Sequence, residues 1–513
     1  MSLLPSTRCL NLLKKCKSLN QLKQAHGQAI ACGLGHNSFA LSRILALCAE
    51  VRLQTGTSTA ADHAWKLFQS IHRPTICICN TAIKCLLQND DLSKIFQVYS
   101  TIWRNGMYPD DYTLPYVLKA CLKLESRFNG EAVHGSCLKL GLEWFTVVGN
   151  SFILFYSGFG CMGAAGKVFD EMPSPCVVSW TSMVSGYAKA GEVGKARLCF
   201  DQAPIKDGGL WGAMISGYVQ NSCYKECLYL FKLMQLADVQ PDEGIFSSIL
   251  TASAQLGALD TGMWIHRQLT RSGFQLSTRL STALVDMYVK CGNLALARNL
   301  FDEIPDRDVV CWNVMISGVA IHGDGENALK LLLEMEAAGL QPDDITFLTI
   351  LAACSHSNMA SEGLMILDKM CNEYKLEPKS EHFGCIVDLL SREGLLQEAE
   401  RIIQRMPSSS SSSEEAIAWR ALLNACCSQG DAQLAEVAAE RLFKLESHSG
   451  AYTLLSNLYS AAGKHDEAKR VRKMMRDRGV EKSPGSSSIE IGGSVHEFVA
   501  GEKTQPEFSS PTT

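Results

Sequence analysis

Apolar residues recur along most of this chain at the spacing of one face of an α-helix. One such stripe consists of Trp180, Met183, Val184, Tyr187 and Ala188. These residues stand at i, i+3, i+4, i+7 and i+8, which is the pattern of an amphipathic helix. Gly191 follows, where a left-handed C-terminal cap needs no Cβ. A second apolar stripe over 193–200 ends before Pro204, so the unit predicts two consecutive helices.

The same pair of predicted helices returns along the chain. Its first helix begins with a small polar residue, continues with aliphatic residues and ends at a glycine or polar turn. The recurring positions are 80, 115, 150, 181, 212, 282, 313, 348 and 384, with steps of 31, 35 or 36 residues and one double step of 70. A single helical hairpin cannot bury its apolar face alone, so neighbouring units must stack. We therefore predict an all-α fold, an α-solenoid superhelix of tandem helix-turn-helix repeats.

Length and composition agree with a repeat array. A chain of 513 residues is too long for one ordinary core. No stretch of 18 apolar residues occurs, so no membrane span is expected. The formal net charge of −5 argues against a sequence-blind nucleic-acid binder, which needs a broad basic face. A binder with a local basic groove remains compatible with this charge.

The cysteines and the N-terminus bear on compartment and chemistry. The 21 cysteines are scattered without any C-x-x-C pair, which favours buried thiols in a reducing compartment over disulfides or a metal site. No acidic residue precedes Glu50. Such a basic, acid-free start resembles an organelle transit sequence, and residues 1–15 are the segment we assign to it.

Three strings carry a resemblance to a known family. They are VVSWTSMVSGYAKAGEVGKARLCFD, TALVDMYVKCGNLALARNLFDEIPDRDVVCWNVMISG and PDDITFLTILAACSH. They resemble the pentatricopeptide-repeat (PPR) family, specifically the land-plant PLS subfamily that alternates P, L and S repeats. The resemblance spans about residues 6–500. It implies PLS-type repeats over 16–414, two PPR-like extension (E) motifs over 415–483 and a C-terminal extension tail over 484–513.

The C-terminal region resembles that of RNA-editing factors of the E subgroup. Residues 416–431 and 450–485 look like the two extension motifs, and 489–506 like the segment that follows them. Pro484-Gly485 is followed by serines where the family usually shows a Cys and a Trp. The chain then stops at Thr513, where many relatives continue into a DYW-type deaminase domain.

One sequence match to zinc-deaminase chemistry does occur, but it is incomplete. His465 and Glu467 form an H-x-E, but no cysteine follows Cys427. Zinc needs three protein ligands. We therefore expect no metal, no cofactor, no catalytic residue and no enzyme activity.

The resemblance also implies which side chains would read RNA. In this family, one residue early in the first helix and the last residue of the repeat face a base together. The pairs are Asn80 with Asp110, Asn150 with Cys176, Thr181 with Asp207, Gly212 with Asp242, Thr282 with Asp308, and Asn313 with Asp343. Asn–Asp pairs resemble uridine readers, Thr–Asp pairs guanosine readers and the Asn–Cys pair a pyrimidine reader, whereas Gly212 should discriminate poorly. The sequence expected is 5′-U-n-Y-G-n-n-G-U, with the edited cytidine several nucleotides beyond it.

A third family position would sandwich the base. Val147, Val178 and Val310 occupy it, while Gly209 and Arg279 depart from it. For each Asn or Thr of the pairs, the structural alternative is a helix N-cap or first-turn residue. Trp180 and Trp312 precede the base-facing position and are expected to serve in helix packing. The basic run from Lys464 to Lys482 could contact phosphates or form a solvated helix face.

The function that this resemblance implies is sequence-specific binding of single-stranded organellar RNA. The chain would act as a site-recognition factor for C-to-U RNA editing and RNA modification, recruiting a DYW-type deaminase or other editing factors in trans through residues 415–506. We expect it in the mitochondrion, with the chloroplast as the alternative, and without a membrane or small-molecule ligand. Two alternatives are a splicing, stability or translation factor in organellar mRNA processing, and a helical protein-protein interaction scaffold.

Overall fold

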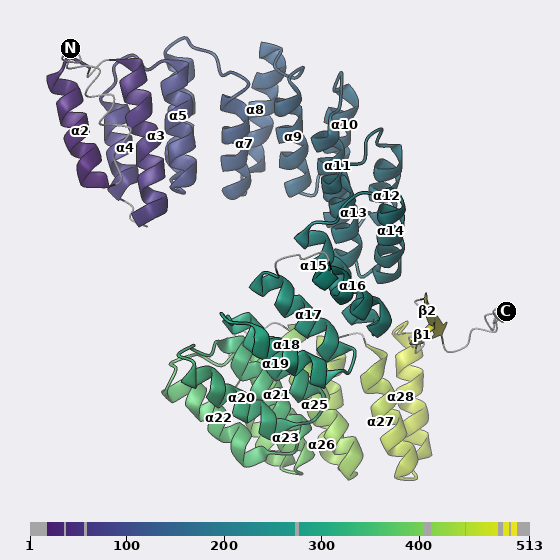
Figure 1. Ribbon diagram of the computed structural model, residues 1–513. Helices are drawn as coiled ribbons and strands as arrows, with labels where there is room; N and C mark the ends of the chain where they lie inside the picture. The colour runs from purple at the N-terminus through teal and green to yellow at the C-terminus, as the bar shows by residue number, and fades with distance from the viewer. Residues whose placement is uncertain are drawn as a thin grey trace. The chain divides into compact units, whose positions relative to one another are not determined.

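The computed structural model describes residues 18–34, 37–55, 59–271, 276–404, 406, 412–446, 448–480, 486–491 and 494–499. They form helices α2 to α28 and strands β1 and β2 (Figure 1). The transit segment expected over 1–15 lies outside the described residues, and so does most of the serine run 408–413.

In the first half of the chain the helices are α2 (Leu19–Ala31), α3 (Ser38–Thr55), α4 (Thr59–Gln69), α5 (Ile76–Gln88), α6 (Leu92–Arg104), α7 (Thr113–Lys123), α8 (Arg127–Leu140), α9 (Thr146–Gly158), α10 (Met162–Glu171), α11 (Val177–Lys189), α12 (Val193–Gln202), α13 (Gly208–Gln220) and α14 (Tyr224–Leu236).

In the second half they are α15 (Glu243–Leu256), α16 (Leu259–Arg271), α17 (Thr278–Lys290), α18 (Leu294–Glu303), α19 (Val309–Ile321), α20 (Gly325–Ala337), α21 (Asp344–His356), α22 (Ala360–Asn372), α23 (Ser380–Arg392), α24 (Leu396–Gln404), α25 (Ser412–Gln429), α26 (Ala432–Leu445), α27 (Ser449–Ala461) and α28 (His465–Asp477).

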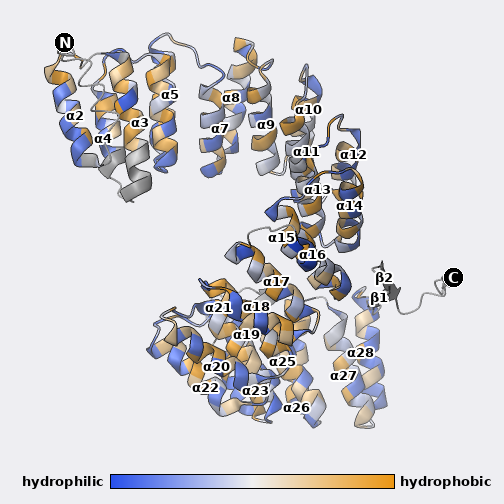
Figure 2. Cartoon of the chain, viewed as in Figure 1, coloured by the Kyte–Doolittle hydropathy of each residue, from blue (hydrophilic) through white to orange (hydrophobic). Residues whose placement is uncertain are grey.

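Odd-numbered helices are the first helices of the repeats and even-numbered helices the second. The pair α11 and α12 corresponds to the unit expected from the apolar stripes, and Gly191 between them has φ +77°. Met183 and Val184 of the stripe are buried. Figure 2 shows hydrophobic and hydrophilic residues side by side on the helices, as amphipathic packing requires. The prediction of an all-α repeat solenoid is confirmed.

Contacts divide the chain into two units, residues 1–223 with 230–241, and residues 224–229 with 242–513. In the first unit, each first helix from α5 to α11 packs against the next first helix. In the second unit the same holds from α15 to α25. Second helices such as α6 and α20 pack on their own first helix and on the following one. This arrangement makes the first helices a continuous layer within each unit.

Glycine permits close approach in that layer. A Cβ placed on Gly318 of α19 would lie 2.7 Å from a methyl carbon of Val289 on α17. The small residue in the middle of the repeated first-helix string therefore lets neighbouring first helices pack closely.

A recurrent ring contact joins consecutive repeats. A phenylalanine late in a second helix meets a tryptophan in the first turn of the next first helix, edge to face. The ring centroids lie 4.7 Å apart for Phe169–Trp180, 4.9 Å for Phe200–Trp211 and 4.8 Å for Phe301–Trp312. The prediction that Trp180 and Trp312 serve in helix packing is confirmed.

The tail contains an element that the sequence pattern did not lead us to expect. Strand β1 (Ser486–Ile491) pairs antiparallel with β2 (Ser494–Val499), with Ser488 opposite Glu497. The sequence places Gly492-Gly493 between the strands, and two glycines between two β-rich runs are a hairpin signal. The hairpin adds to the helical solenoid without altering it.

Two further expectations can be compared with the described residues. Their cysteines are all free thiols. Cys79 and Cys121 are buried as expected, whereas Cys32, Cys77 and Cys176 are exposed. Among the described helices, none is both long enough and apolar enough to cross a membrane.

Candidate nucleic-acid interface

The two members of each predicted pair occupy fixed places in the helices. The first member is the fifth residue of a first helix, as Asn80 is in α5 and Thr181 in α11. The second member lies at the N-terminus of the next first helix. Cys176, Asp207, Asp242, Asp308 and Asp343 are the N-cap residues of α11, α13, α15, α19 and α21. The alternative of an N-cap or first-turn role is wrong, because each Asn or Thr is the fifth residue of its helix and another residue, such as Thr75 in α5 or Ser277 in α17, is the N-cap.

At the first pair, the structure brings Asn80 and Asp110 into direct contact. Asn80 Nδ2 donates to Asp110 Oδ1 at 2.9 Å and to Oδ2 at 3.1 Å. The hydroxyl of Thr113 donates to Asn80 Oδ1 at 2.7 Å. Asp110 Oδ1 also accepts the backbone N–H of Thr113 at 2.8 Å. The amide is therefore held between a carboxylate and a hydroxyl.

The last pair repeats this arrangement. Asn313 Nδ2 donates to Asp343 Oδ1 at 3.1 Å, and Thr346 Oγ1 donates to Asn313 Oδ1 at 2.7 Å. Asp343 Oδ1 accepts the Thr346 N–H at 2.8 Å. Asn313 is mostly buried, with 8% of its surface exposed. A buried amide must be hydrogen-bonded, and this network supplies the partners.

Cysteine replaces aspartate in the pair of Asn150. Its Nδ2 lies 3.6 Å from Cys176 Sγ, while Ser179 Oγ donates to Asn150 Oδ1 at 2.6 Å. Burial acts to raise the pKa of the exposed Cys176 thiol, but hydrogen bonds from Ser179, Asn150 and the backbone outweigh it and lower the pKa from 9.0 to about 7. A thiolate at a helix N-terminus with several donors is a favourable case. The lowered pKa favours ionisation of the Cys176 thiol at the place where the other pairs have an aspartate.

The threonine pairs are organised differently. Thr181 Oγ1 donates to Val177 O, and Thr282 Oγ1 to Thr278 O, each at 2.8 Å within its own helix. Asp207 caps α13 by accepting an N–H at 2.9 Å. Since the hydroxyl proton is used inside the helix, each threonine offers only acceptor lone pairs to a ligand.

In the two remaining pairs, the aspartate caps the helix that follows. Asp308 caps α19 by accepting the Cys311 N–H at 2.9 Å. Asp242 does the same for Ile245 in α15, also at 2.9 Å. Gly212 is the fifth residue of α13 and has no side chain, which fits the expectation that it discriminates poorly.

Apolar side chains are exposed three residues before the first members of the pairs. The exposed fractions are 61% for Val147, 57% for Val178 and 60% for Val310. Residues three apart lie on the same helix face, so each valine stands beside its pair. Two exposed residues that stand two positions after Asp110 and Asp343 were missed by sequence reasoning. They are Tyr112, 67% exposed, and Ile345, 55% exposed.

A pocket of about 340 Å³ surrounds the first pair. It is lined by Ile76, Cys77, Asn80, Thr81, Lys84, Asp110, Tyr112 and Tyr116. The lining combines the hydrogen-bonding pair with two tyrosine rings and one lysine. Aromatic rings, amides and a cation are the groups that stack on bases, bond to base edges and contact phosphates.

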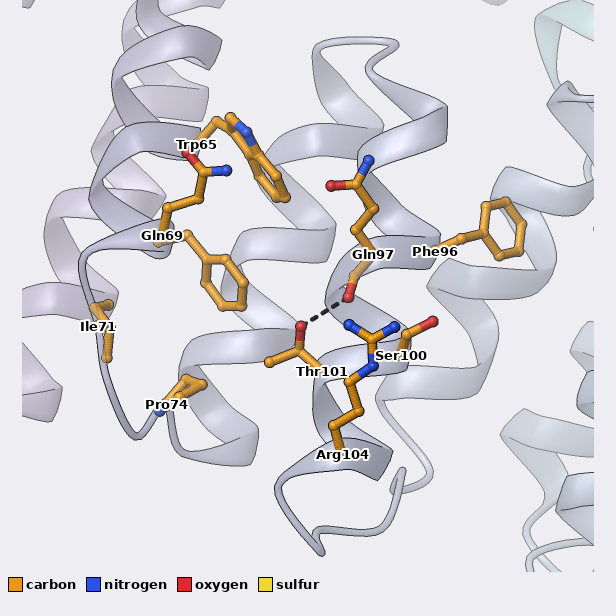
Figure 3. A pocket seen from close by; sticks show the side chains of 10 residues that line it. Trp65, Gln69, Ile71, Pro74, Phe96, Gln97, Ser100, Thr101 and Arg104 are labelled. Carbon is orange, nitrogen blue, oxygen red and sulfur yellow. Dashed lines mark hydrogen bonds between the residues drawn. The ribbon is translucent and has the colours of Figure 1, made fainter.

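A larger pocket lies away from the pairs. Figure 3 shows side chains of α4 and α6, with Trp65 and Gln69 on one side and Gln97 and Arg104 on the other. Its volume is about 640 Å³. None of the predicted site residues lines it, so it does not contribute to the candidate interface.

The expected absence of a zinc site and the two interpretations of the basic run both concern α28. His465 and Glu467 lie in α28, and no group of three or more possible metal ligands occurs among the described residues. In the basic run, Lys469 and Arg470 form exposed ion pairs one turn apart on α28 with Asp466 and Glu467. Both interpretations of this run, phosphate contact and solvated face, stay predictions.

Comparisons with known proteins place these features in context. Models described as PPR repeat match residues 178–204, 210–239, 281–309, 345–373 and 381–411, and a PPR repeat family model matches 307–356. A model described as E motif matches residues 429–490.

Curated relatives from Arabidopsis thaliana match nearly the whole chain. Pentatricopeptide repeat-containing protein At2g20540 is 40% identical over 96% of this chain and 91% of its own length. The mitochondrial protein At2g22410 is 37% identical over 97% and 87%, and the chloroplastic protein At1g08070 is 33% identical over 97% and 80%. Among solved structures, the pentatricopeptide repeat protein PPR10 from maize matches with a TM-score of 0.56 and 16% identity, over 93% of this chain and 74% of that one. That structural likeness shows a shared fold.

Proposed function

Because this chain belongs to the pentatricopeptide-repeat family and carries its E motif, we propose that it binds single-stranded organellar RNA and marks a cytidine for C-to-U editing. The repeats over 16–414 read the RNA, one base per repeat. The region 415–506 recruits a DYW-type deaminase or another editing factor in trans.

The observation that carries this proposal is the recurring polar pair between consecutive first helices. The Thr–Asp pairs present hydroxyl and carboxylate acceptors, which complement the N1–H and N2–H donors of guanine. The Asn–Asp pairs present an amide with donor and acceptor together, which complements the N3–H and the carbonyl oxygens of uracil. Bases of single-stranded RNA expose these edges to protein side chains.

The E motif favours editing over the splicing, stability and translation alternative. In this family the extension motifs follow the repeats of editing factors, and the match over 429–490 lies at that place. The organelle we propose is the mitochondrion, with the chloroplast as the alternative. The relatives include a protein named mitochondrial and one named chloroplastic, which supports an organelle without selecting one.

The first test is binding of the purified chain to an RNA that contains U-n-Y-G-n-n-G-U. We expect each G-to-A or U-to-G replacement at a paired position to weaken binding by about 1–3 kcal/mol, and replacements at the n positions to have little effect. Equal affinity for all these RNAs would contradict the base assignments.

A second experiment distinguishes RNA binding from the scaffold alternative. Proteins captured with the chain before and after ribonuclease treatment are compared. Loss of capture after treatment supports an RNA-dependent assembly, whereas unchanged capture together with absent RNA binding would favour the scaffold. Sequencing organellar transcripts from plants that lack the protein then decides between lost editing of one cytidine and a defect in splicing or transcript abundance.

A further inference from the structure

Each asparagine of the predicted pairs has a third polar neighbour that the two-residue pairing does not include. These neighbours are Thr113, Ser179 and Thr346, and each has 0% of its surface exposed. Each lies three residues after the second member of its pair, and each hydroxyl oxygen lies 2.6 or 2.7 Å from the asparagine Oδ1. The two threonine hydroxyls also lie 2.7 and 2.8 Å from the aspartate Oδ1. Because that oxygen already accepts the asparagine Nδ2 and a backbone N–H, we assign the single hydroxyl proton to the asparagine Oδ1. Burying a hydroxyl costs free energy unless it is hydrogen-bonded, so these positions need a reason to be polar.

Helix capping is not a sufficient reason. Each hydroxyl also accepts the backbone N–H of the second pair member, at 3.1–3.2 Å. In α11 and α21 this bond completes a capping box. However, Asp207 and Asp308 cap their helices with Leu210 and Cys311 at the same place. These two residues stand behind the threonines of the pairs. The hydroxyl thus accompanies asparagine and is absent behind both Thr181 and Thr282.

The difference follows from the chemistry of the amide. An asparagine carries a donor and an acceptor that exchange places when the amide turns over. The carboxylate of Asp343 only accepts, so it holds Nδ2, while the hydroxyl of Thr346 holds Oδ1. A threonine needs no such partner, because its hydroxyl is already oriented by the carbonyl of its own helix.

We propose that Thr113 and Thr346 are positioning residues that fix the amide of the preceding repeat's asparagine and so make it select uridine over cytidine. Ser179 holds Asn150 in the same way, but cysteine replaces the carboxylate there, so we expect a weaker preference between the two pyrimidines at that base. Uracil presents a donor at N3 and an acceptor at position 4, whereas cytosine presents an acceptor at N3 and a donor at position 4. An amide fixed in one orientation distinguishes the two bases, and an amide that turns over fits either. This inference rests on the proposed RNA binding.

The test uses Thr346→Val, which removes the hydroxyl and keeps the shape of the side chain. The backbone N–H of residue 346 still reaches Asp343, so the side-chain N-cap bond remains, whereas the Asp343 N–H loses the Thr346 hydroxyl as its acceptor. The full-length protein is titrated with the eight-nucleotide RNA carrying U or C at its last position. We expect the preference for U over C at that position to fall roughly three- to tenfold, the effect of losing one ordinary hydrogen bond. Thr346→Ser should restore the preference, and the preference for G at the base of Thr282 should not change.

A gain-of-function variant tests the same rule in another repeat. Thr282→Asn alone places an asparagine in front of Cys311, which lacks the hydroxyl. Asp308 alone would then orient the amide, so we expect this variant to show only a weak preference for U over C at its base. Adding Cys311→Thr should produce a preference for U, and Cys311→Thr alone should leave the preference for G.

The possible outcomes distinguish a failure of the proposed RNA reading from a failure of the positioning role alone. If the unmodified protein shows no base preference at the position of Asn313, the proposed RNA reading fails. If it prefers U and Thr346→Val keeps that preference undiminished, the positioning role is overturned while RNA reading stands. Uniform weakening for all bases, without rescue by serine, would assign Thr346 a merely structural role and would also overturn the inference.

Discussion

At the residue scale, the aspartate of each Asn–Asp pair makes two kinds of contact. Asp343 caps α21 and holds the Asn313 amide through the same oxygen. Asp110 Oδ1 likewise holds the Asn80 amide and accepts the N–H of Thr113, the first residue of α7, although Tyr112 is the N-cap residue of that helix. An N-cap aspartate contributes about 1 kcal/mol to its helix, so local stability and the proposed base reading would depend on one side chain. The helix cap therefore also fixes the polar group that would face a base.

Cys176 makes one position of the interface sensitive to pH. Its pKa of about 7 lies below the ordinary thiol value of 9.0, so the thiolate and its hydrogen bonds are present above pH 7 and lost as pH falls through 7. We expect the preference for U over C at the base of Asn150 to be roughly three- to tenfold stronger at pH 8 than at pH 6. Fluorescence anisotropy with the two RNAs at both pH values measures this.

Cys176→Asp is the matched control for this prediction. A carboxylate stays ionised over the whole range, so its preference should not vary between pH 6 and pH 8. An equal pH dependence in this variant would show that another group titrates.

At the element scale, the turn between the two helices of a repeat requires a left-handed residue. Gly191 supplies it with φ +77°, whereas Ser222 holds the same place after α13 with φ +58°. Left-handed backbone costs an L-residue about 1–2 kcal/mol relative to glycine. The turn at Ser222 is therefore less stable than the turn at Gly191.

Exchanging the two residue types tests this difference. We expect Ser222→Gly to stabilise its repeat and Gly191→Ala to destabilise its repeat, each by about 1 kcal/mol. The Cβ of an alanine at 191 would approach its nearest neighbour, Asn221 Oδ1, only to 3.9 Å, so the cost is conformational. Native-state hydrogen exchange of amides in α11 and α13 measures both effects. A faster exchange in Ser222→Gly would contradict the argument.

At the scale of the whole molecule, charge limits how the chain can bind RNA. The formal net charge is −5, so attraction to phosphates is confined to local groups such as Lys84 beside the first pair. Base contacts then supply most of the affinity. This distribution favours a selective reader over one that binds any RNA.

The salt dependence of the RNA affinity measures how much phosphate contacts and base contacts each contribute. A protein with six to ten phosphate contacts loses about 10³–10⁵-fold in affinity between 50 and 200 mM salt. For the matched RNA we expect a loss below about a hundredfold, because fewer contacts of that kind are available. The mismatched RNA at each salt concentration is the control, since base discrimination should persist when the phosphate contribution is screened. A loss of about 10³-fold or more would mean that a basic surface, such as that of α28, dominates binding.

The sequence by itself determined the repeat architecture, and the family resemblance of its motifs indicated the paired residues. Periodic apolar residues must be buried wherever they occur, so the helices follow from spacing alone, and the repeat length brings residues such as Asn313 and Asp343 to corresponding places in successive units. The tryptophans were correctly assigned to packing for the same reason. The hairpin of the tail was missed because its signal, Gly492-Gly493 between short β-rich runs, is weak beside a strong helical repeat.

Only the tertiary structure decided which atoms meet. It showed that the aspartates cap the helices, that Thr113, Ser179 and Thr346 hold the asparagine amides, and that Cys176 has a lowered pKa. These facts depend on distances of about 3 Å between side chains some 30 residues apart. Spacing along the chain can bring two helices together, but hydrogen-bond direction depends on how closely those helices pack, and this is fixed by contacts such as that of Gly318 with Val289.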